Sequence, residues 1–330
     1  MNISLYKNVL VYDGVLFDSN LVPIHESTIL SNLPHRKDNK YHEDQLKSAQ
    51  SSLKKLFASG NASIFIKEFF GPCFWAYYPW DKNPQHFIIE TLPRILLMIK
   101  EAGVTPGLLF LNNNLINSEI ATFAMREAPC LLAPTGKQYV YKLSECYVSS
   151  NININFVNTS PLGAELLRGF RSELVNSSLS FEAKIAKDAR VYVDRISSPL
   201  NNAPGRTCIN QSEVRSSLLS NGFSIVATED MGFYNRVTFF SECSEMMSVS
   251  GANLMNSFFT GKRISKIHHL VHPAFIGNCA WFKGFFEDIV GAQNFEHLIL
   301  DTDSSTGLTF KEFMSLPFKI EIQSLNKIIS

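Results

Sequence analysis

The sequence predicts an α/β protein of two domains, and three observations support this fold class. Short apolar runs alternate with segments whose apolar residues recur at helical spacing, as expected for sheets covered by helices. A polar stretch rich in asparagine, residues 151–161, divides this alternation into two halves. The chain has 330 residues, 45% of them hydrophobic, and can bury two ordinary cores. We therefore expect α/β domains at 1–160 and 161–330.

The first half begins with a predicted β-hairpin. Two apolar runs up to Phe17 flank Asp13-Gly14, a dipeptide that favours a tight turn between antiparallel strands. Phe70-Gly71-Pro72 is expected to end the element before it. The aromatic residues that follow, Trp80 among them, are expected in the core, with a sugar-stacking platform as the alternative. Apolar periodicity predicts the other elements: helices at 43–57 and 118–126, strands at 63–66 and 107–112, and one or two strands within 137–149.

The segment 83–100 predicts a helix with a polar stripe on an otherwise apolar surface. His86, Glu90 and Arg94 follow at steps of four residues, so they lie on one side of the helix. Pro93 lacks an amide hydrogen, so the helix is expected to kink there or to begin anew near Leu92. An irregular helix that carries an imidazole and a carboxylate suits the wall of a cleft. A salt ladder at the protein surface is the alternative.

The second half repeats the alternation around a glycine turn. Residues 246–250 predict a strand that ends at Gly251, and Ala252-Asn253 begins the next helix. The first amide groups of a helix have no partner inside it, so this junction is a candidate phosphate seat. A tight turn with an asparagine cap is the alternative, because neither the dinucleotide-binding glycine pattern nor a P-loop is present. The other predicted elements are strands at 190–194, 222–227, 266–271 and 297–300, and helices at 163–174, 211–220, 233–243, 281–290 and 309–314.

Two α/β halves are expected to form a crevice at the carboxyl ends of their strands, where ligands of such folds bind. Arg195 directly follows the strand 190–194, so its guanidinium can project into the crevice and bind phosphate oxygens. An ion pair with Asp194 or Glu213 is the alternative for Arg195. Asn210 and Glu213 fit a capping box at the start of the helix 211–220.

Composition and charge argue against several classes of function. Lys and Arg together number 30, as do Asp and Glu, so no overall basic field favours nucleic acid. No apolar run is long enough to span a membrane, and the first residues lack the pattern of a secretory signal. The six cysteines have no Cys-x-x-Cys spacing, which indicates buried thiols in a reducing compartment and argues against zinc. We therefore expect a cytoplasmic protein.

Three blocks of the sequence resemble one enzyme family. The segment 86–94, His-Phe-Ile-Ile-Glu-Thr-Leu-Pro-Arg, is similar to a family pattern of His-(Trp/Phe) followed by Glu-x-(Leu/Val)-Pro-Arg. Arg195 with the segment 206–213 resembles a second pattern, Arg, several residues and Arg-x-Ile/Leu-x-Asn-x-x-Glu. Glu229 and the segment 250–256 resemble the third, which ends in His-Gly-Ala-Gly-Leu-Thr-Asn. By order and spacing over residues 84–273, the chain resembles a bacterial-like member of glycosyltransferase family 61, the DUF563-type glycosyltransferases.

The resemblance implies a GT-B fold, in which two Rossmann-like domains face each other across a cleft. It also implies an inverting sugar transfer without a bound metal, and we interpret the triplet Asp301-Thr302-Asp303 as a loop. The implied donor is a nucleotide sugar, with a UDP-sugar favoured. The implied acceptor is a glycan or lipid-linked glycan in the synthesis of bacterial capsule, lipopolysaccharide or O-antigen. Peripheral association with the inner face of the membrane and the oligomeric state stay open.

Roles for individual residues follow from the same resemblance. Glu90 is the expected base for the acceptor hydroxyl, with His86 as the alternative base or as the group that orients Glu90. Arg94 and Trp80 are expected on the acceptor side. The residues expected to bind the donor are Arg195, Arg206, Asn210, Glu229, Ser250, Gly251, Ala252, Asn253 and Asn256.

Two positions depart from the family pattern. Ser250 stands where the family usually has His, and Asn253 stands where it has a second Gly. A changed donor and a lost activity would both account for these departures. The alternative function is therefore a protein of the same fold that only binds a nucleotide sugar or glycan.

Overall fold

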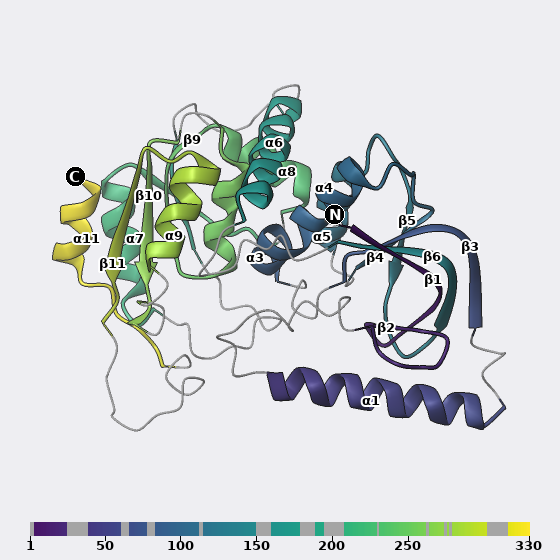
Figure 1. Cartoon of the computed structure of the whole chain (residues 1–330). Coiled ribbons are helices and arrows are strands. Elements are labelled where there is room, and N and C mark those ends of the chain that lie inside the picture. Colours follow the sequence, from purple (N-terminus) through teal and green to yellow (C-terminus); the bar gives the residue numbers. More distant parts are fainter. Residues whose placement is uncertain are drawn as a thin grey trace. The chain divides into compact units, whose positions relative to one another are not determined.

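The computed structural model describes residues 3–24, 39–60, 66–77, 83–111, 115–149, 160–178, 189–194, 208–229, 231–261, 264–273, 276, 279–301 and 316–330. In these residues the chain is a mixed α/β protein, as predicted. It divides into two compact units, Met1–Leu167 and Arg168–Ser330, each with a sheet of its own (Figure 1). The division falls within helix α6 (Pro161–Ser178). None of the described helices is long and apolar enough to cross a membrane.

The N-terminal sheet has the strand order β2-β1-β6-β3-β4-β5. β1 (Ile3–Tyr12) and β2 (Val15–Phe17) form the predicted hairpin, and both turn residues, Asp13 and Gly14, have positive φ. β1 pairs antiparallel with β6. The other neighbours are parallel: β6 (Val140–Ser149), β3 (Ile66–Trp75), β4 (Leu108–Leu111) and β5 (Leu131–Pro134).

Strand β3 contradicts the predicted break at Phe70-Gly71-Pro72. The strand runs through these residues to Trp75, and its register against β6 shifts between Phe69 and Pro72. Such a β-bulge accommodates a proline, which has no amide hydrogen to give to the ladder. The strand can therefore continue into the core, where Trp75 is fully buried.

Two helices of this unit were predicted and are confirmed. α1 (Asn39–Ala58) has an apolar stripe, and α5 (Leu115–Ala124) follows β4. The stripe of α1 packs on the hairpin in a cluster of buried residues: Leu10, Tyr12, Val15, Phe17, Leu46, Ala49, Leu53 and Val140. The hairpin and α1 thus share one small core.

The C-terminal sheet has the order β11-β10-β9-β7-β8, and every neighbouring pair is parallel. From β8 the chain passes back across β7 to form β9, so the order changes direction between β7 and β9. In open α/β sheets, ligands bind at the carboxyl ends of the strands at such a point. The strands are β7 (Ala189–Val193), β8 (Phe223–Val226), β9 (Cys243–Val249), β10 (Lys266–Val271) and β11 (Asn294–Ile299).

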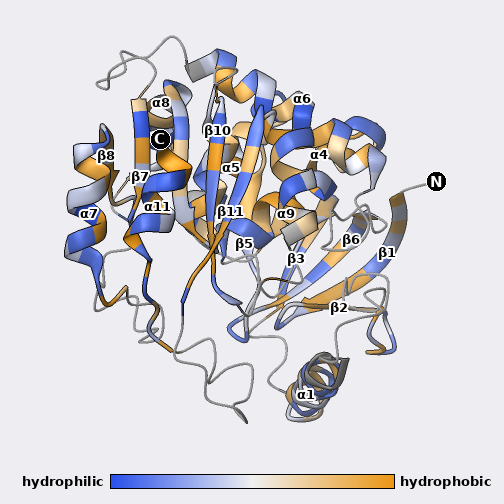
Figure 2. Cartoon of the chain, turned by 90° about the vertical axis from the view of Figure 1, so that its left-hand side faces the viewer, coloured by the Kyte–Doolittle hydropathy of each residue, from blue (hydrophilic) through white to orange (hydrophobic). Residues whose placement is uncertain are grey.

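Helices cover both faces of this sheet. α7 (Gln211–Ser220) and α11 (Ile322–Ile329) share one cluster with Leu270 of β10, and the outward turns of α7 are hydrophilic (Figure 2). His269 points to the opposite face and packs on Phe282 of α9. The elements of that second layer are α8 (Phe233–Ser241), the 3₁₀-helix η4 (Ala252–Phe259), α9 (Cys279–Phe285) and the π-helix η6 (Phe286–Val290). The sequence analysis missed α11, and the helix predicted at 309–314 lies outside the described residues.

A charge cluster joins three strands near their amino ends. Arg190 of β7 donates from Nε and Nη2 to the Glu245 carboxylate of β9 at 2.5 and 3.0 Å, and His268 Nε2 of β10 lies 2.5 Å from Glu245 Oε1. Arg190 also donates to the carbonyl of Ile329 in α11 at 2.7 Å. Burial by itself would raise the pKa of Glu245, but the hydrogen bonds and charges of His268 and Arg190 outweigh it and lower the pKa to about 2.

Replacing Glu245 by Gln should lower the free energy of unfolding of the C-terminal unit at pH 7 by about 3 kcal/mol, the order expected when a half-buried charge cluster loses one partner. The pKa of Glu245 is lowered from 4.5 to about 2, so its stabilising contribution is complete above pH 4.5 and is lost as the pH falls toward 2. Hydrogen exchange of the β9 amides at several pH values measures both effects. Between pH 4.5 and 2, the free energy of unfolding should change less with pH in the variant than in the wild type.

The matched control is Glu287→Gln in η6. Glu287, which is half-buried, pairs with the exposed Lys283 at 3.8 Å, and such surface pairs contribute less than about 1 kcal/mol. Equal losses of stability in the two variants would contradict the structural role of the charge cluster.

Candidate functional sites

The predicted helix 83–100 consists of three segments. Asn83 caps α3 (Pro84–His86), and its side chain accepts a hydrogen bond from the amide of Gln85 at 2.9 Å. A π-helical turn, η3 (Phe87–Thr91), follows, and α4 (Leu92–Glu101) begins as predicted at Leu92. The amide of Leu92 donates to the carbonyl of Phe87, which is the i→i−5 bond of a π turn. The next residue, Pro93, has no amide with which to form an ordinary helical bond.

The π turn carries Glu90, whose carboxylate is held by His86. His86 Nδ1 lies 2.8 Å from Glu90 Oε2, and which of the two groups donates depends on the imidazole tautomer. Glu90 is fully buried, whereas 19% of the His86 side chain is exposed. The pair is therefore not the surface salt ladder considered above. A carboxylate held by one oxygen beside a partly exposed imidazole is suited to accept a proton.

Arg94 binds the backbone around Glu90. Its Nε donates to the carbonyl of Glu90 at 3.1 Å, and its Nη2 donates to the carbonyls of Ala76 at 2.9 Å and Tyr77 at 3.4 Å. Only 1% of Arg94 is exposed. The guanidinium thus ties the π turn to the carboxyl end of β3. Trp80, which was expected beside it on the acceptor side, lies outside the described residues.

The place of this cluster in the N-terminal sheet is a second point where the strand order changes direction. The parallel strands lie in the order β6-β3-β4-β5, so the reversal falls between β6 and β3. Ala76 directly follows β3, and Val148 of β6 pairs with Trp75 of β3. The buried Glu90 is therefore anchored at the edge of the sheet where ligands of α/β proteins bind.

In the C-terminal sheet the glycine turn lies at the reversal of strand order. Asp194 directly follows β7 and Ser250 directly follows β9, and Asn253 Nδ2 donates to the carbonyl of Asp194 at 3.4 Å. Gly251 has a φ of 129°, a conformation that side chains with a Cβ rarely adopt. The predicted strand, turn and helix are all present, but the helix η4 is 3₁₀ rather than α.

The carboxylate of Asp194 is held by the first turns of α7. Arg215 donates from Nε to Asp194 Oδ2 at 2.8 Å, and Gln211 Nε2 donates to Oδ1 at 3.1 Å. Asp194 is 3% exposed, so the end of β7 is fixed to α7 on one side and to Asn253 on the other. Arg195 and Arg206 lie outside the described residues.

Asn210 occupies the N-cap position of α7 but does not form the predicted capping box. Its side chain makes no cap hydrogen bond. Instead Nδ2 donates to the carbonyl of Ile320 at 2.7 Å, and Oδ1 accepts from the amide of Ile320 at 3.1 Å. A carboxamide has the same donor and acceptor pair as a peptide group, so it can pair with the backbone as a strand does. Asn210 thereby fastens the C-terminal segment.

Arg236 of α8 is a site residue that the sequence analysis missed. It donates to the carbonyls of Met231, at 2.8 Å, and Thr228, and also to Oδ1 of Asn256 at 3.3 Å. Asn256 is 2% exposed and donates to the carbonyl of Asn253 at 2.8 Å. Arg236 thus joins the loop after β8 to the glycine turn. The sequence does contain a signal for Arg236: it is a cationic residue within the otherwise apolar predicted helix 233–243.

Glu229 lies in the loop that Arg236 holds. Its Oε2 atom is buried and has no hydrogen-bond partner among the described residues. A buried carboxylate oxygen without a partner is costly, so this oxygen is a candidate acceptor for a donor from water or a ligand. Within the described ranges, no group of His, Cys, Asp and Glu side chains has a geometry that could hold a metal ion.

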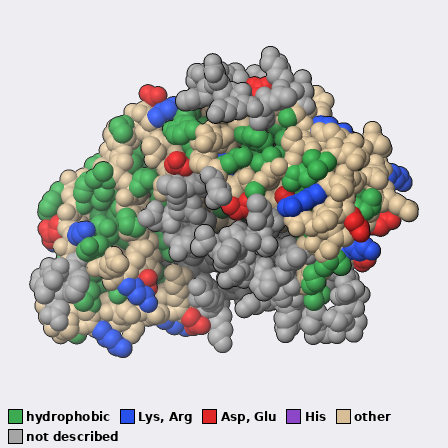
Figure 3. All heavy atoms as spheres, turned by 180° about the vertical axis from the view of Figure 1, so that it is seen from behind, with side chains coloured by type: hydrophobic (Ala, Val, Ile, Leu, Met, Phe, Trp, Pro, Cys, Tyr) green, Lys and Arg blue, Asp and Glu red, His purple; other side chains and the backbone are tan. Residues whose placement is uncertain are grey.

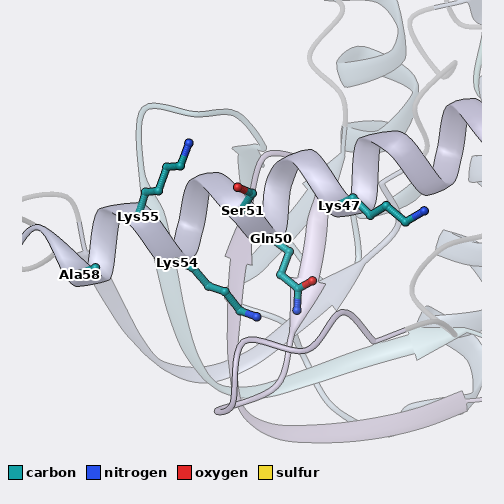
Figure 4. A pocket seen from close by; sticks show the side chains of 6 residues that line it. All are labelled: Lys47, Gln50, Ser51, Lys54, Lys55 and Ala58. Carbon is teal, nitrogen blue, oxygen red and sulfur yellow. The ribbon is translucent and has the colours of Figure 1, made fainter.

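A separate groove lies along the exposed side of α1 (Figure 4). It offers lysine, amide and hydroxyl groups but no carboxylate or imidazole, and we assign no transfer chemistry to it. On the face shown in Figure 3, acidic and basic side chains are dispersed rather than gathered in one field. The groove is lined by Lys47, Gln50, Ser51, Lys54, Lys55 and Ala58.

Comparison with known families matches residues 85–267 to the family described as Glycosyltransferase 61. The match covers more than half of the chain. The protein belongs to glycosyltransferase family 61. A search of curated proteins finds no match. The matched residues of this glycosyltransferase include the π turn with Glu90, the glycine turn and Arg236, so both sites described above lie within the family region. As a glycosyltransferase, the protein moves a sugar from a donor to an acceptor.

Replacing Arg94 by Lys in this glycosyltransferase should lower the free energy of unfolding by about 2–3 kcal/mol, because one ammonium cannot replace the forked bonds to separate carbonyls. Urea unfolding followed by circular dichroism measures the change. Arg126→Lys is the matched control, since exposed Arg126 donates to the carbonyl of Phe123 within its own turn. A similarly small loss of stability in both variants would argue against the role of Arg94 in tying the π turn to the end of β3.

Proposed function

We propose that this family 61 enzyme is an inverting, metal-independent glycosyltransferase of the GT-B type, whose N-terminal unit binds the acceptor and whose C-terminal unit binds a nucleotide sugar. The observation that carries the proposal is the hydrogen bond between His86 and the buried Glu90 at the carboxyl edge of the N-terminal sheet. An inverting transfer needs one base near the acceptor hydroxyl, and this pair supplies a carboxylate held in one orientation.

Glu90 acts as the base in this proposal. It removes the proton from the acceptor hydroxyl while that oxygen attacks the anomeric carbon, and the nucleotide leaves from the opposite side of the sugar. His86 orients the carboxylate through Oε2. Arg94 contacts the backbone and so serves as a positioning residue rather than as a contact of the acceptor. Trp80 remains a proposed acceptor contact.

The leaving diphosphate is assigned to the glycine turn. In this proposal Gly251 bends the chain before η4, and the first amides of that helix, at Ala252 and Asn253, donate to the phosphate oxygens. Fixed dipoles of this kind stabilise charge as it develops, without a metal ion. Arg195 and Arg206 remain proposed partners of the same diphosphate.

The nucleoside is assigned to the loop after β8. The buried Oε2 of Glu229 supports a role in accepting hydrogen bonds from ribose hydroxyls. Asn256 and Asn210 are engaged by Arg236 and Ile320, which supports positioning roles for them rather than direct contacts with the donor.

For the substrates, we propose a UDP-sugar as donor and a glycan or lipid-linked glycan of bacterial surface polysaccharide as acceptor. The equal numbers of basic and acidic residues support an uncharged glycan over a polyanion such as nucleic acid. We further propose that the enzyme works in the cytoplasm, at the inner face of the membrane where a lipid-linked acceptor would be reached.

Replacing Glu90 by Gln should lower kcat of sugar transfer by about 10²–10⁴-fold, the usual contribution of a general base, and leave the affinity for the donor unchanged. Release of the nucleotide in the presence of an acceptor pool measures kcat, and calorimetry measures donor affinity. Glu68→Gln is the control, because Glu68 forms an exposed pair with Lys142 at 2.8 Å. Transfer at the wild-type rate by the Glu90 variant would rule out the proposed base.

Replacing Glu229 by Ala should weaken binding of the nucleotide by about tenfold, the loss of one or two hydrogen bonds to a charged group. A thermal-shift screen of UDP, GDP and CDP identifies the nucleotide, since a bound ligand raises the melting temperature by mass action. Exposed Glu213 of α7 provides the control substitution to Ala. Unchanged nucleotide affinity in the Glu229 variant would remove Glu229 from the donor site.

A further inference from the structure

A chain of three polar side chains lies directly beneath the glycine turn. Ser250 Oγ is 2.6 Å from His269 Nε2, and His269 Nδ1 is 3.2 Å from Nδ1 of His297. Ser250 Oγ also lies 3.3 Å from the carbonyl of Leu270, and the amide of Ser250 donates to the same carbonyl at 2.9 Å. This series of side chains thus connects the end of β9 with β10 and β11, and its last member, Ser250, directly precedes Gly251.

The environment of His269 keeps its imidazole neutral. The residue is fully buried, and its ring packs against Phe282 and Phe295 with centroid distances of 4.5 and 5.8 Å. This burial, with a smaller contribution from the charge of His297, lowers the pKa of His269 to about 3. A neutral imidazole has one donor and one acceptor nitrogen. His269 can therefore bridge Ser250 and His297 only if one of its ring nitrogens donates a hydrogen bond and the other accepts one.

Either direction of that chain engages both nitrogens of His269. If the Ser250 hydroxyl donates to Leu270, it accepts from Nε2 of His269, whose Nδ1 then accepts from His297. If the hydroxyl donates to Nε2 instead, Nδ1 donates to His297. Both arrangements fix the side chain of Ser250, which is 4% exposed, and so restrain the peptide that leads into Gly251.

We propose that His269 is a positioning residue for donor binding: it acts through Ser250 to hold the glycine turn in the conformation that receives the diphosphate, and His297 orients its ring. The inference rests on the proposed function, because it takes the glycine turn as the diphosphate seat. A rigid backbone at Gly251 matters because fixed amide dipoles bind an anion without the cost of reorganising during the reaction. Neither histidine belongs to the residues predicted from the sequence.

Two substitutions, each of which reproduces one ring nitrogen of His269, separate positioning from simple packing. A Gln side chain places its amide where Nε2 of His269 lies, and an Asn side chain places its amide near Nδ1. His269→Gln should therefore keep the contact with Ser250 and bind the nucleotide diphosphate within about threefold of wild type, whereas His269→Asn should bind it about tenfold more weakly. Ser250→Ala should match the His269→Asn loss, and the double variant should lose no more than either single one.

The measurements are calorimetric Kd values for whichever of UDP, GDP and CDP binds the wild type, with the melting temperature of each variant and the KM of the acceptor as controls. A raised donor KM at unchanged acceptor KM is the expected kinetic signature. If His269→Gln and His269→Asn weaken binding equally, or if the losses of Ser250→Ala and His269→Asn add, the positioning role is overturned and packing explains the effect. If none of the nucleotides binds the wild type, the proposed donor site itself fails, an outcome distinct from the previous one.

Discussion

The constraint on which the C-terminal unit depends is the reversal of strand order between β7 and β9. In a parallel sheet each connection leaves from the carboxyl end of a strand, so two connections that lead in opposite directions leave the edge between them uncovered. Asp194 and Ser250 directly follow the two strands that flank this edge, and Asn253 links the two segments by donating to the carbonyl of Asp194. In the proposed function the ligand is received at this edge, and the residues of the turn at Gly251 supply the amides.

The opposite ends of the same strands are held together by charge. The Glu245 carboxylate accepts from Arg190 and interacts with His268, and these contacts link the side chains of β7, β9 and β10. Alternation along β10 then turns the next residue, His269, to the other face, toward Ser250 and His297. Two adjacent histidines therefore serve the two faces of the sheet: His268 in an ion cluster and His269 in an uncharged series of hydrogen bonds.

Both candidate sites combine a backbone irregularity with side chains that stabilise it. Glu90 stands in a π turn before Pro93, and Arg94 binds the carbonyls around it. Gly251 has a strongly positive φ, and hydrogen bonds to Ser250 and Asn253 hold the residues on either side. Irregular turns of this kind are frequent at functional sites because they aim groups that a regular helix or strand would direct elsewhere.

The sequence by itself determined the elements whose signals are local. The hairpin turn at Asp13-Gly14, the new helix at Leu92 and the strand that ends before Gly251 follow from turn chemistry, the missing proline amide and apolar periodicity. Only the tertiary structure decided the partners of the polar side chains. Asn210 pairs with Ile320, 110 residues away, instead of forming a capping box, and Pro72 lies in a bulge that exists only because β6 is beside it. A local pattern shows which hydrogen bonds a side chain can form, but competing partners from distant parts of the chain determine which ones it does form.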